Sequence, residues 1–334
     1  MQILLWLLLP VAAASGWWAA RYSQKKRHAG SRAVLNSAYG QGLNYLLNEQ
    51  PDKATEVLVQ MLEVDPDTVE LHLALGSLLR RRGEVDRAIR VHENVMGRLS
   101  LSEDLRAQAS LELGRDFLKA GLLDRAEQLF ARMLSKGLHE KEVCRHLADV
   151  YQQVSEWEKA IEIGRRLARI DSGAWNIRVA HYVCELGELA LQQRDLERAL
   201  RHAEQALDDD PGCVRATLLR GRCYEAQGDF RAAVDAYRQV QEQDASLIPE
   251  VIGALERCYA ALGEPAASQA GQASGTAAVC VEDDVAVVAA RRSGVGEARY
   301  RCEACGFSSR KLFWQCPGCR SWSTVKPITA GNAQ

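Results

Sequence analysis

The 334-residue sequence lacks the short motifs by which many enzymes hold a phosphate, a catalytic metal or a nucleophile. It has no G-x-x-x-x-G-K-[ST] loop, no G-x-G-x-x-G after a strand, no H-E-x-x-H and no G-x-S-x-G. Its seven histidines are scattered, and none is paired with a carboxylate at a spacing typical of catalysis. These absences argue against an enzyme.

The chain also lacks a dominant charge of either sign. Its 42 basic and 44 acidic residues leave a net charge of −2, so no overall electrostatic attraction to nucleic acid or to an anionic membrane is expected. Hydrophobic residues make up 47% of the sequence, which is enough to bury a core. The length allows two or three domains.

Residues 35–263 contain hardly any strand signal and instead show a repeat. A small residue recurs every 34 to 39 positions, at Gly42, Gly76, Gly114, Ala148, Gly187 and Gly221. Twelve positions after each comes an alanine, at Ala54, Ala88, Ala126, Ala160, Ala199 and Ala233. This pattern resembles the tetratricopeptide repeat, a helix–turn–helix unit of 34 residues whose two helices touch closely where both carry small side chains. We expect an all-α superhelix of about six repeats, covered at its end by an unpaired helix over Ile248–Leu262.

The first helices of such repeats line a concave groove that binds peptides or domains. By repeat position, the residues expected to face this groove are Arg80, Arg81, Leu111, Arg115, Lys119, Arg145, Asp149, Gln152, Gln153, Glu188, Arg215, Arg222 and Glu225. Four of them form a basic cluster that could bind an acidic partner, namely Arg80, Arg81, Arg115 and Lys119. The alternative for each residue is an ordinary solvated helix face.

The N-terminal run from Gln2 to Ala20 contains no charged residue. It is about long enough for one membrane-spanning helix, which needs ~20 residues. Basic residues follow it, so the positive-inside rule predicts an anchor at 1–20, a basic juxtamembrane segment at 21–34 and a cytoplasmic remainder. The competing interpretation is a cleaved signal peptide with its cleavage site near Ala12–Ala14, but the basic segment that normally precedes the apolar run is missing.

Two C-x-x-C pairs lie near the C-terminus, Cys302/Cys305 and Cys316/Cys319. This spacing turns both sulfurs of a pair toward one ion, and four soft thiolates select zinc or iron. The alternatives are two disulfides or four core thiols. With no histidine or carboxylate at a ligand position, the site is expected to be structural or electron-carrying. Free ligand thiols indicate a reducing compartment. The other six cysteines are expected to be apolar fillers: Cys144, Cys184, Cys213, Cys223, Cys258 and Cys280.

Residues 299–328 are too few to build an ordinary hydrophobic core, so we expect the metal to replace it. Five side chains are expected to pack around the sulfurs: Phe307, Leu312, Phe313, Trp314 and Trp322. The module is locally basic, which raises nucleic-acid binding as an alternative, although a membrane anchor on the same chain argues against it. Small and polar residues dominate the segment before the module, so 264–298 is predicted to be a linker.

The run YRCEACGFSSRKLFWQCPGCRSWSTVKPI, from Tyr300 to Ile328, closely resembles the lipopolysaccharide assembly protein B family of Gram-negative inner-membrane proteins. The N-terminal LLWLLLPVAAASGWWAARYS resembles it as well. The resemblance implies a rubredoxin-like site for one iron or zinc ion, with the ligands Cys302, Cys305, Cys316 and Cys319.

The same resemblance implies a function that the spacing of residues does not. It implies a non-catalytic, single-pass adaptor of the bacterial inner membrane that restrains lipopolysaccharide synthesis. Family members present the deacetylase of the lipid A pathway to the membrane protease FtsH for degradation, and an inner-membrane lipopolysaccharide sensor antagonises them. Two alternatives stay open: a membrane-tethered, rubredoxin-like electron carrier and a general envelope-assembly scaffold.

Overall fold

The computed structural model describes residues 68–99, 101–171, 173, 175–263 and 300–328, together with Lys53, Val57 and Val59. The chain divides into two compact units, residues 1–146 and 147–334. The predicted anchor, juxtamembrane segment and linker lie outside the described residues, as does most of the first repeat. Within the described part, no helix is both long and apolar enough to cross a membrane.

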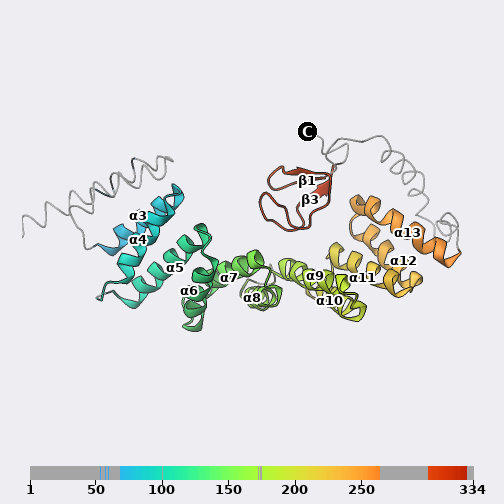
Figure 1. Cartoon of the computed structure of the whole chain (residues 1–334), viewed down its shortest axis with the longest axis horizontal. Coiled ribbons are helices and arrows are strands. Elements are labelled where there is room, and N and C mark those ends of the chain that lie inside the picture. Colours follow the sequence, from blue (N-terminus) through green and yellow to red (C-terminus); the bar gives the residue numbers. More distant parts are fainter. Residues whose placement is uncertain are drawn as a thin grey trace, which may run out of the picture. The chain divides into compact units, whose positions relative to one another are not determined.

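Helices account for all regular structure described before residue 300, and they follow one another as antiparallel hairpins (Figure 1). The first unit contains α3 (Val69–Arg81), α4 (Val85–Met96), α5 (Glu103–Lys119) and α6 (Leu123–Ser135). Helix α7 (Glu140–Val154) runs across the boundary between the units. The second unit continues with α8 (Trp157–Ile170), α9 (Asn176–Gln192), α10 (Leu196–Asp209), α11 (Val214–Gln227), α12 (Phe230–Gln243), the 3-10 turn η1 (Ala245–Leu247) and α13 (Ile248–Leu262).

The small residues of the repeat lie where the two helices of a hairpin touch. A Cβ atom added to Gly114 would come within 2.5 Å of the Phe130 ring, and one added to Gly221 would come within 2.6 Å of Tyr237. The alanine of the second helix is 0% exposed in each described repeat, at Ala88, Ala126, Ala160, Ala199 and Ala233. The spacing that predicted the hairpins is therefore a steric requirement for close helix contact.

Local signals at the helix ends also act as expected. Helix α11 is capped at its C-terminus by Gly228, whose φ of 81° is costly for other residues. Asp229 then caps α12 by accepting a hydrogen bond from the Ala232 N–H at 3.1 Å. Helix α13 covers the same residues as the predicted capping helix. The cysteines that the structure describes in the helical part are buried, as predicted for apolar fillers: Cys144, Cys184, Cys213, Cys223 and Cys258.

The C-terminal module is a small antiparallel sheet closed by loops. Strand β1 (Tyr300–Cys302) lies between β2 (Ser308–Ser309) and β3 (Val325–Pro327). In the register of β1 with β3, Cys302 is opposite Val325. The all-α prediction holds for the described repeats, and the described strands are confined to this metal-ribbon module.

Candidate metal centre

Two matching turns carry the four cysteines, and we call them the first knuckle (Cys302–Gly306) and the second knuckle (Cys316–Arg320). In each, the residue after the second cysteine donates its N–H to the carbonyl of the first cysteine, at 2.9 Å from Gly306 and 2.8 Å from Arg320. Both donors have positive φ angles, 76° for Gly306 and 60° for Arg320. Gly306 adopts this conformation without strain, whereas the second knuckle puts an arginine in a backbone conformation that favours glycine.

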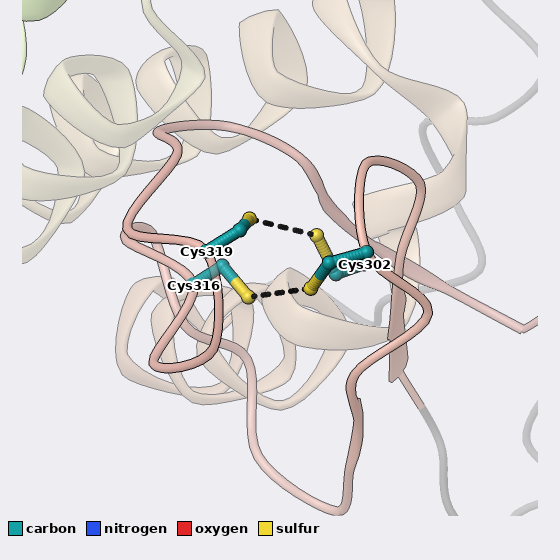
Figure 2. Close-up of side chains that lie close together, drawn as sticks. Cys302, Cys316 and Cys319 are labelled. Atoms are coloured by element: carbon teal, nitrogen blue, oxygen red, sulfur yellow. Dashed lines mark hydrogen bonds between the residues drawn. The ribbon is translucent and has the colours of Figure 1, made fainter. Parts of the chain in front are cut away.

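The knuckles bring the four sulfurs together, all within 4.8 Å of one another. The Sγ atoms of Cys302 and Cys319 are 3.7 Å apart, and those of Cys305 and Cys316 are 3.6 Å apart (Figure 2). A tetrahedron with metal–sulfur bonds of about 2.3 Å has edges of about 3.8 Å, whereas a disulfide would need about 2.05 Å. The thiols are free, and Cys305 and Cys319 are exposed, which does not suit a core thiol. The arrangement fits one metal ion.

Ionisation of the thiols shows why the site needs a cation. Burial raises the pKa of Cys302, but hydrogen bonds with the Thr324 hydroxyl and with the N–H groups of Cys305 and Ala304 lower it to about 6. The Phe307 N–H lowers the pKa of Cys305, yet lost hydration and the neighbouring sulfurs raise it to about 12. Four thiolates this close do not ionise together without a compensating charge. A bound cation would supply that charge and convert its binding energy into folding energy.

The predicted apolar cover around the sulfurs is only partly right. Phe307, Leu312 and Phe313 pack against the cluster that contains the two buried ligands, as expected. The prediction is wrong for Trp314 and Trp322. Trp314 packs against the core of α12 and α13, and Trp322 packs against residues of α7, α9 and α11. Both indoles join the module to the helices of its own unit.

Trp322 occupies what we call the indole site, formed by Gln152, His181, Tyr182 and Arg215. Its Nε1 donates a hydrogen bond to Gln152 Oε1 at 3.0 Å. Its ring stacks on His181, with centroids 4.8 Å apart and an interplanar angle of 17°, and meets the Tyr182 ring edge-on at 5.9 Å. The Arg215 guanidinium lies 5.9 Å from the ring centroid. The only polar atom of the indole is therefore hydrogen-bonded, and its ring is contacted by aromatic and cationic side chains.

Gln152 is fixed by the helices as well as by the module. Its Oε1 also accepts hydrogen bonds from Tyr182 Oη at 2.8 Å and from Arg178 Nη2 at 3.0 Å. The Arg178 guanidinium is in turn held over the Trp175 ring at 4.2 Å. Because three donors converge on one atom, the orientation of the Gln152 amide is determined. The acceptor for the indole N–H is thus already aimed by repeat residues.

His181 is buried beneath the module, and no sequence pattern predicted a role for it. It is 2% exposed, and its Nε2 is 2.6 Å from Ser323 Oγ, a partner 142 positions away. Burial and the nearby charge of Arg215 lower the pKa of His181 to about 3, so the imidazole is neutral at pH 7. In the sequence, a single histidine on a helix cannot be distinguished from an ordinary core histidine, and no local pattern links His181 to the second knuckle.

A second group of contacts holds the other side of the module. Lys326 Nζ on β3 is 2.6 Å from Asp244 Oδ2, just before η1. The Tyr300 hydroxyl on β1 donates a hydrogen bond to Glu250 on α13. These polar contacts lie beside the apolar contact of Trp314 with α12 and α13. The metal ribbon therefore rests on the helices of its own unit through two sets of side chains, which Trp314 connects because its ring centroid is also 6.3 Å from that of His181.

Two of the four residues predicted to bind a partner are engaged within the first unit. Arg80 is in ion pairs with Glu112 at 2.6 Å and with Asp116 at 2.7 Å. Burial lowers the pKa of Arg80, but these two carboxylates outweigh it, so that the net shift is upward. Arg115 is also paired with Glu112, at 2.6 Å. The charge of Arg80 in particular stabilises the fold through these ion pairs and is only slightly accessible to a binding partner.

The other two, Arg81 and Lys119, are exposed at the C-terminal ends of α3 and α5. Among the residues that the structure describes, neither forms an ion pair. Partner binding by this basic cluster stays a prediction, and Arg81 and Lys119 are the members whose charges face solvent.

The fold and the site define a class: a tetratricopeptide-repeat protein with a rubredoxin-type metal module. A family model described as rubredoxin metal binding domain matches residues 300–327. Tetratricopeptide repeat models match residues 71–107, 105–174 and 184–247. A crystal structure of MamA protein matches 55% of this chain and 96% of that chain, with 20% identity and a TM-score of 0.38.

Curated relatives narrow the class to one family. Lipopolysaccharide assembly protein B of Escherichia coli (strain K12) is 34% identical over 383 residues, covering 98% of both chains. The protein of the same name from Haemophilus influenzae is 30% identical over 395 residues, again covering 98% of both. The chain belongs to the lipopolysaccharide assembly protein B family.

Proposed function

We propose that this protein is a non-catalytic adaptor that regulates lipopolysaccharide biosynthesis by promoting FtsH-dependent degradation of the lipid A pathway deacetylase. The observation that carries the proposal is the match to lipopolysaccharide assembly protein B over 98% of the chain, through repeats and metal module alike. Tandem repeats supply an extended surface for a client protein. A shared membrane location would raise the effective concentration of client near protease.

We propose further that the chain is a single-pass protein of the bacterial inner membrane with its bulk in the cytoplasm. The uncharged run from Gln2 to Ala20 and the basic residues after it support this topology. Proteolysis of spheroplasts and of inverted membrane vesicles tests it. The repeats should be cleaved only in inverted vesicles, and cleavage in intact spheroplasts would refute the topology.

The regulatory role is tested by deleting the gene and following the deacetylase over time after protein synthesis is stopped. The deacetylase should persist in the deletion strain and be degraded again when the gene is restored. Unchanged turnover in the deletion strain would refute this role and leave a general envelope-assembly scaffold or an electron carrier. Affinity capture from detergent-solubilised membranes should recover both FtsH and deacetylase, with metal content measured on the same sample.

The exposed part of the basic cluster can be tested in the same capture. Arg81→Glu combined with Lys119→Glu should reduce recovery of an acidic client by about tenfold, because two attractive charges become repulsive. Arg231→Glu, at an exposed arginine of α12, serves as the matched surface control. Equal recovery by all three proteins would show that the client binds elsewhere.

A second candidate is an electron carrier, favoured by the exposure of Cys305 and Cys319 at the metal centre. Iron held by four thiolates changes oxidation state, and exposed ligands shorten the path to a redox partner. Purified protein would then contain iron and show a reversible potential. Zinc with no redox response would eliminate this candidate without affecting the adaptor proposal.

A further inference from the structure

The indole site contacts Trp322 in several chemically distinct ways. Gln152 provides an acceptor for the indole N–H, His181 a stacking surface and Tyr182 an edge contact. A hydroxyl partner for the residue after the tryptophan is present too, since His181 Nε2 contacts Ser323 Oγ. The site therefore matches a short peptide feature, a tryptophan followed by a hydroxyl residue.

The parts of this site come from the repeats and are largely held by repeat residues. Tyr182 and Arg178 bind the same Gln152 oxygen that accepts from Trp322. Arg215 is anchored by Glu185 at 2.9 Å. These contacts do not involve the module, so the site is pre-organised to receive an indole from any source. It also lies on first helices, the face by which repeats of this type bind ligands.

The occupant, in contrast, depends on the metal ribbon for its position. Trp322 lies three positions after the ligand Cys319 and forms a bridge with Gln315, which precedes the ligand Cys316. The carbonyl of Ser321 accepts the Cys316 N–H at 2.9 Å. The second knuckle thus holds Trp322 at the angle at which it enters the indole site. Since a ribbon this small relies on its ion to fold, loss of the ion would release the indole.

From this arrangement we propose that the indole site is a peptide-binding site for a tryptophan-containing segment of a partner protein, kept closed by Trp322 while the module holds its metal. Metal loss withdraws Trp322 and opens the site. The metal ribbon then competes with the partner peptide for the indole site, because its own Trp322 occupies that site. The inference rests on the indole site and the thiolate cluster, so it stands or falls independently of the lipopolysaccharide role.

The test measures binding of a fluorescent peptide, acetyl-RSWSTV-amide, to the full-length protein in detergent micelles. Four proteins are compared: metal-loaded wild type, chelator-treated wild type, Cys302→Ser with Cys316→Ser, and metal-loaded Trp322→Ala. The Trp322→Ala substitution vacates the indole site without removing the ion, and metal analysis verifies that the ion is still bound. We expect the three proteins with a vacated site to bind the peptide at least tenfold more tightly than metal-loaded wild type.

Peptide variants then identify the recognised group without altering the protein. Acetyl-RSASTV-amide lacks the indole, and a peptide with 1-methyltryptophan keeps the ring but cannot donate to Gln152. Both should bind at least tenfold more weakly to chelator-treated wild type. Absence of binding to every protein, equal binding to metal-loaded wild type, or equal binding of the alanine or methylated peptide would each overturn the proposal. Circular dichroism checks that the helices persist in all four proteins.

Discussion

The α3–α5 face of the first unit and the α9–α11 face of the second are built on the same repeat spacing but differ in chemistry. On the first, Arg80 is paired with Glu112 and Asp116 of the next repeat. The second face also has ion pairs between adjacent repeats, Arg215 with Glu185 and Arg222 with Glu188, but in addition it carries the aromatic contacts to Trp322. The spacing of small residues therefore sets the backbone, whereas residues between those positions decide whether a face also receives another segment.

The largest expected effect follows removal of the metal ligands, and it should change the second face while leaving the first face unchanged. Cys302→Ser combined with Cys316→Ser should reduce the metal content from one ion per chain to none and unfold residues 300–328. In zinc-finger peptides the corresponding binding energy is about 10–16 kcal/mol at pH 7, far more than so small a sheet can replace. Hydrogen exchange should rise in the module and on α9, but not in α3 or α5. Unchanged exchange of the module would show that it folds without metal.

The next effect is confined to the first face. Asp116 is 0% exposed and binds both His92 and Arg80, so Asp116→Ala leaves a buried histidine and an arginine without their shared acceptor. We expect a loss of about 3–5 kcal/mol in the free energy of unfolding, measured by urea denaturation. Asp235→Ala, at an exposed position of α12, should cost less than about 0.5 kcal/mol. Similar midpoints for the two variants would mean that the buried network contributes little.

Much of the helical structure was predictable because its signals are local or strictly periodic. Gly114 and Gly221 mark helix contacts within a single hairpin, so the spacing alone reveals them. The four sulfurs were predictable for a similar reason, since each C-x-x-C turn is closed by its own backbone hydrogen bonds. The ion pair of Arg80 with Glu112 spans 32 positions, nearly one repeat, and comparing equivalent positions of adjacent repeats could have found it.

Docking of the module was not predictable from local patterns. Trp322 and Gln152 are 170 positions apart and belong to no common repeat. An aromatic residue beside a metal ligand has the same local pattern whether it covers the sulfurs, as Phe313 does, or leaves the module, as Trp322 does. The choice depends on whether a complementary surface exists elsewhere in the fold. Such a surface is a property of the tertiary structure.

Acidification should weaken docking of the module on the second face, and this effect is smaller than the two above. The pKa of His181 is about 3 when the module covers it, against about 6.5 for an exposed histidine. The uncovered state therefore takes up a proton first as the pH falls. The free energy of docking should be most favourable above about pH 6.5 and should weaken as the pH falls toward about 3, by at most about 1.4 kcal/mol per pH unit. Arg215 opposes protonation of His181 and is itself paired with Glu185. Two further arginines on these helices are also paired, Arg222 with Glu188 and Arg178 with Asp149.

Hydrogen exchange of α9 between pH 7.5 and 5.0, corrected for intrinsic rates, measures this loss. His181→Gln should flatten the dependence because it removes the titrating group. The Lys326 contact does not interfere in this range. Burial raises the pKa of Asp244, but the Lys326 and Ser246 hydrogen bonds lower it below its usual 3.8 overall. Metal content is determined at each pH, and a slope that persists in His181→Gln with the metal retained would assign the effect to another group.

The smallest expected effect is a change in metal affinity when the residue with positive φ is substituted in one knuckle or the other. Gly306 and Arg320 occupy equivalent positions with positive φ, and a Cβ atom on Gly306 would meet nothing within 4 Å. Only backbone strain therefore distinguishes the residue types there, at about 1 kcal/mol. Because metal binding and folding of the ribbon are coupled, Arg320→Gly should tighten metal binding about fivefold and Gly306→Ala should weaken it about fivefold. Competition with a chromophoric chelator measures both, and shifts of the same sign would show that side-chain contacts of Arg320 outweigh the strain of its backbone.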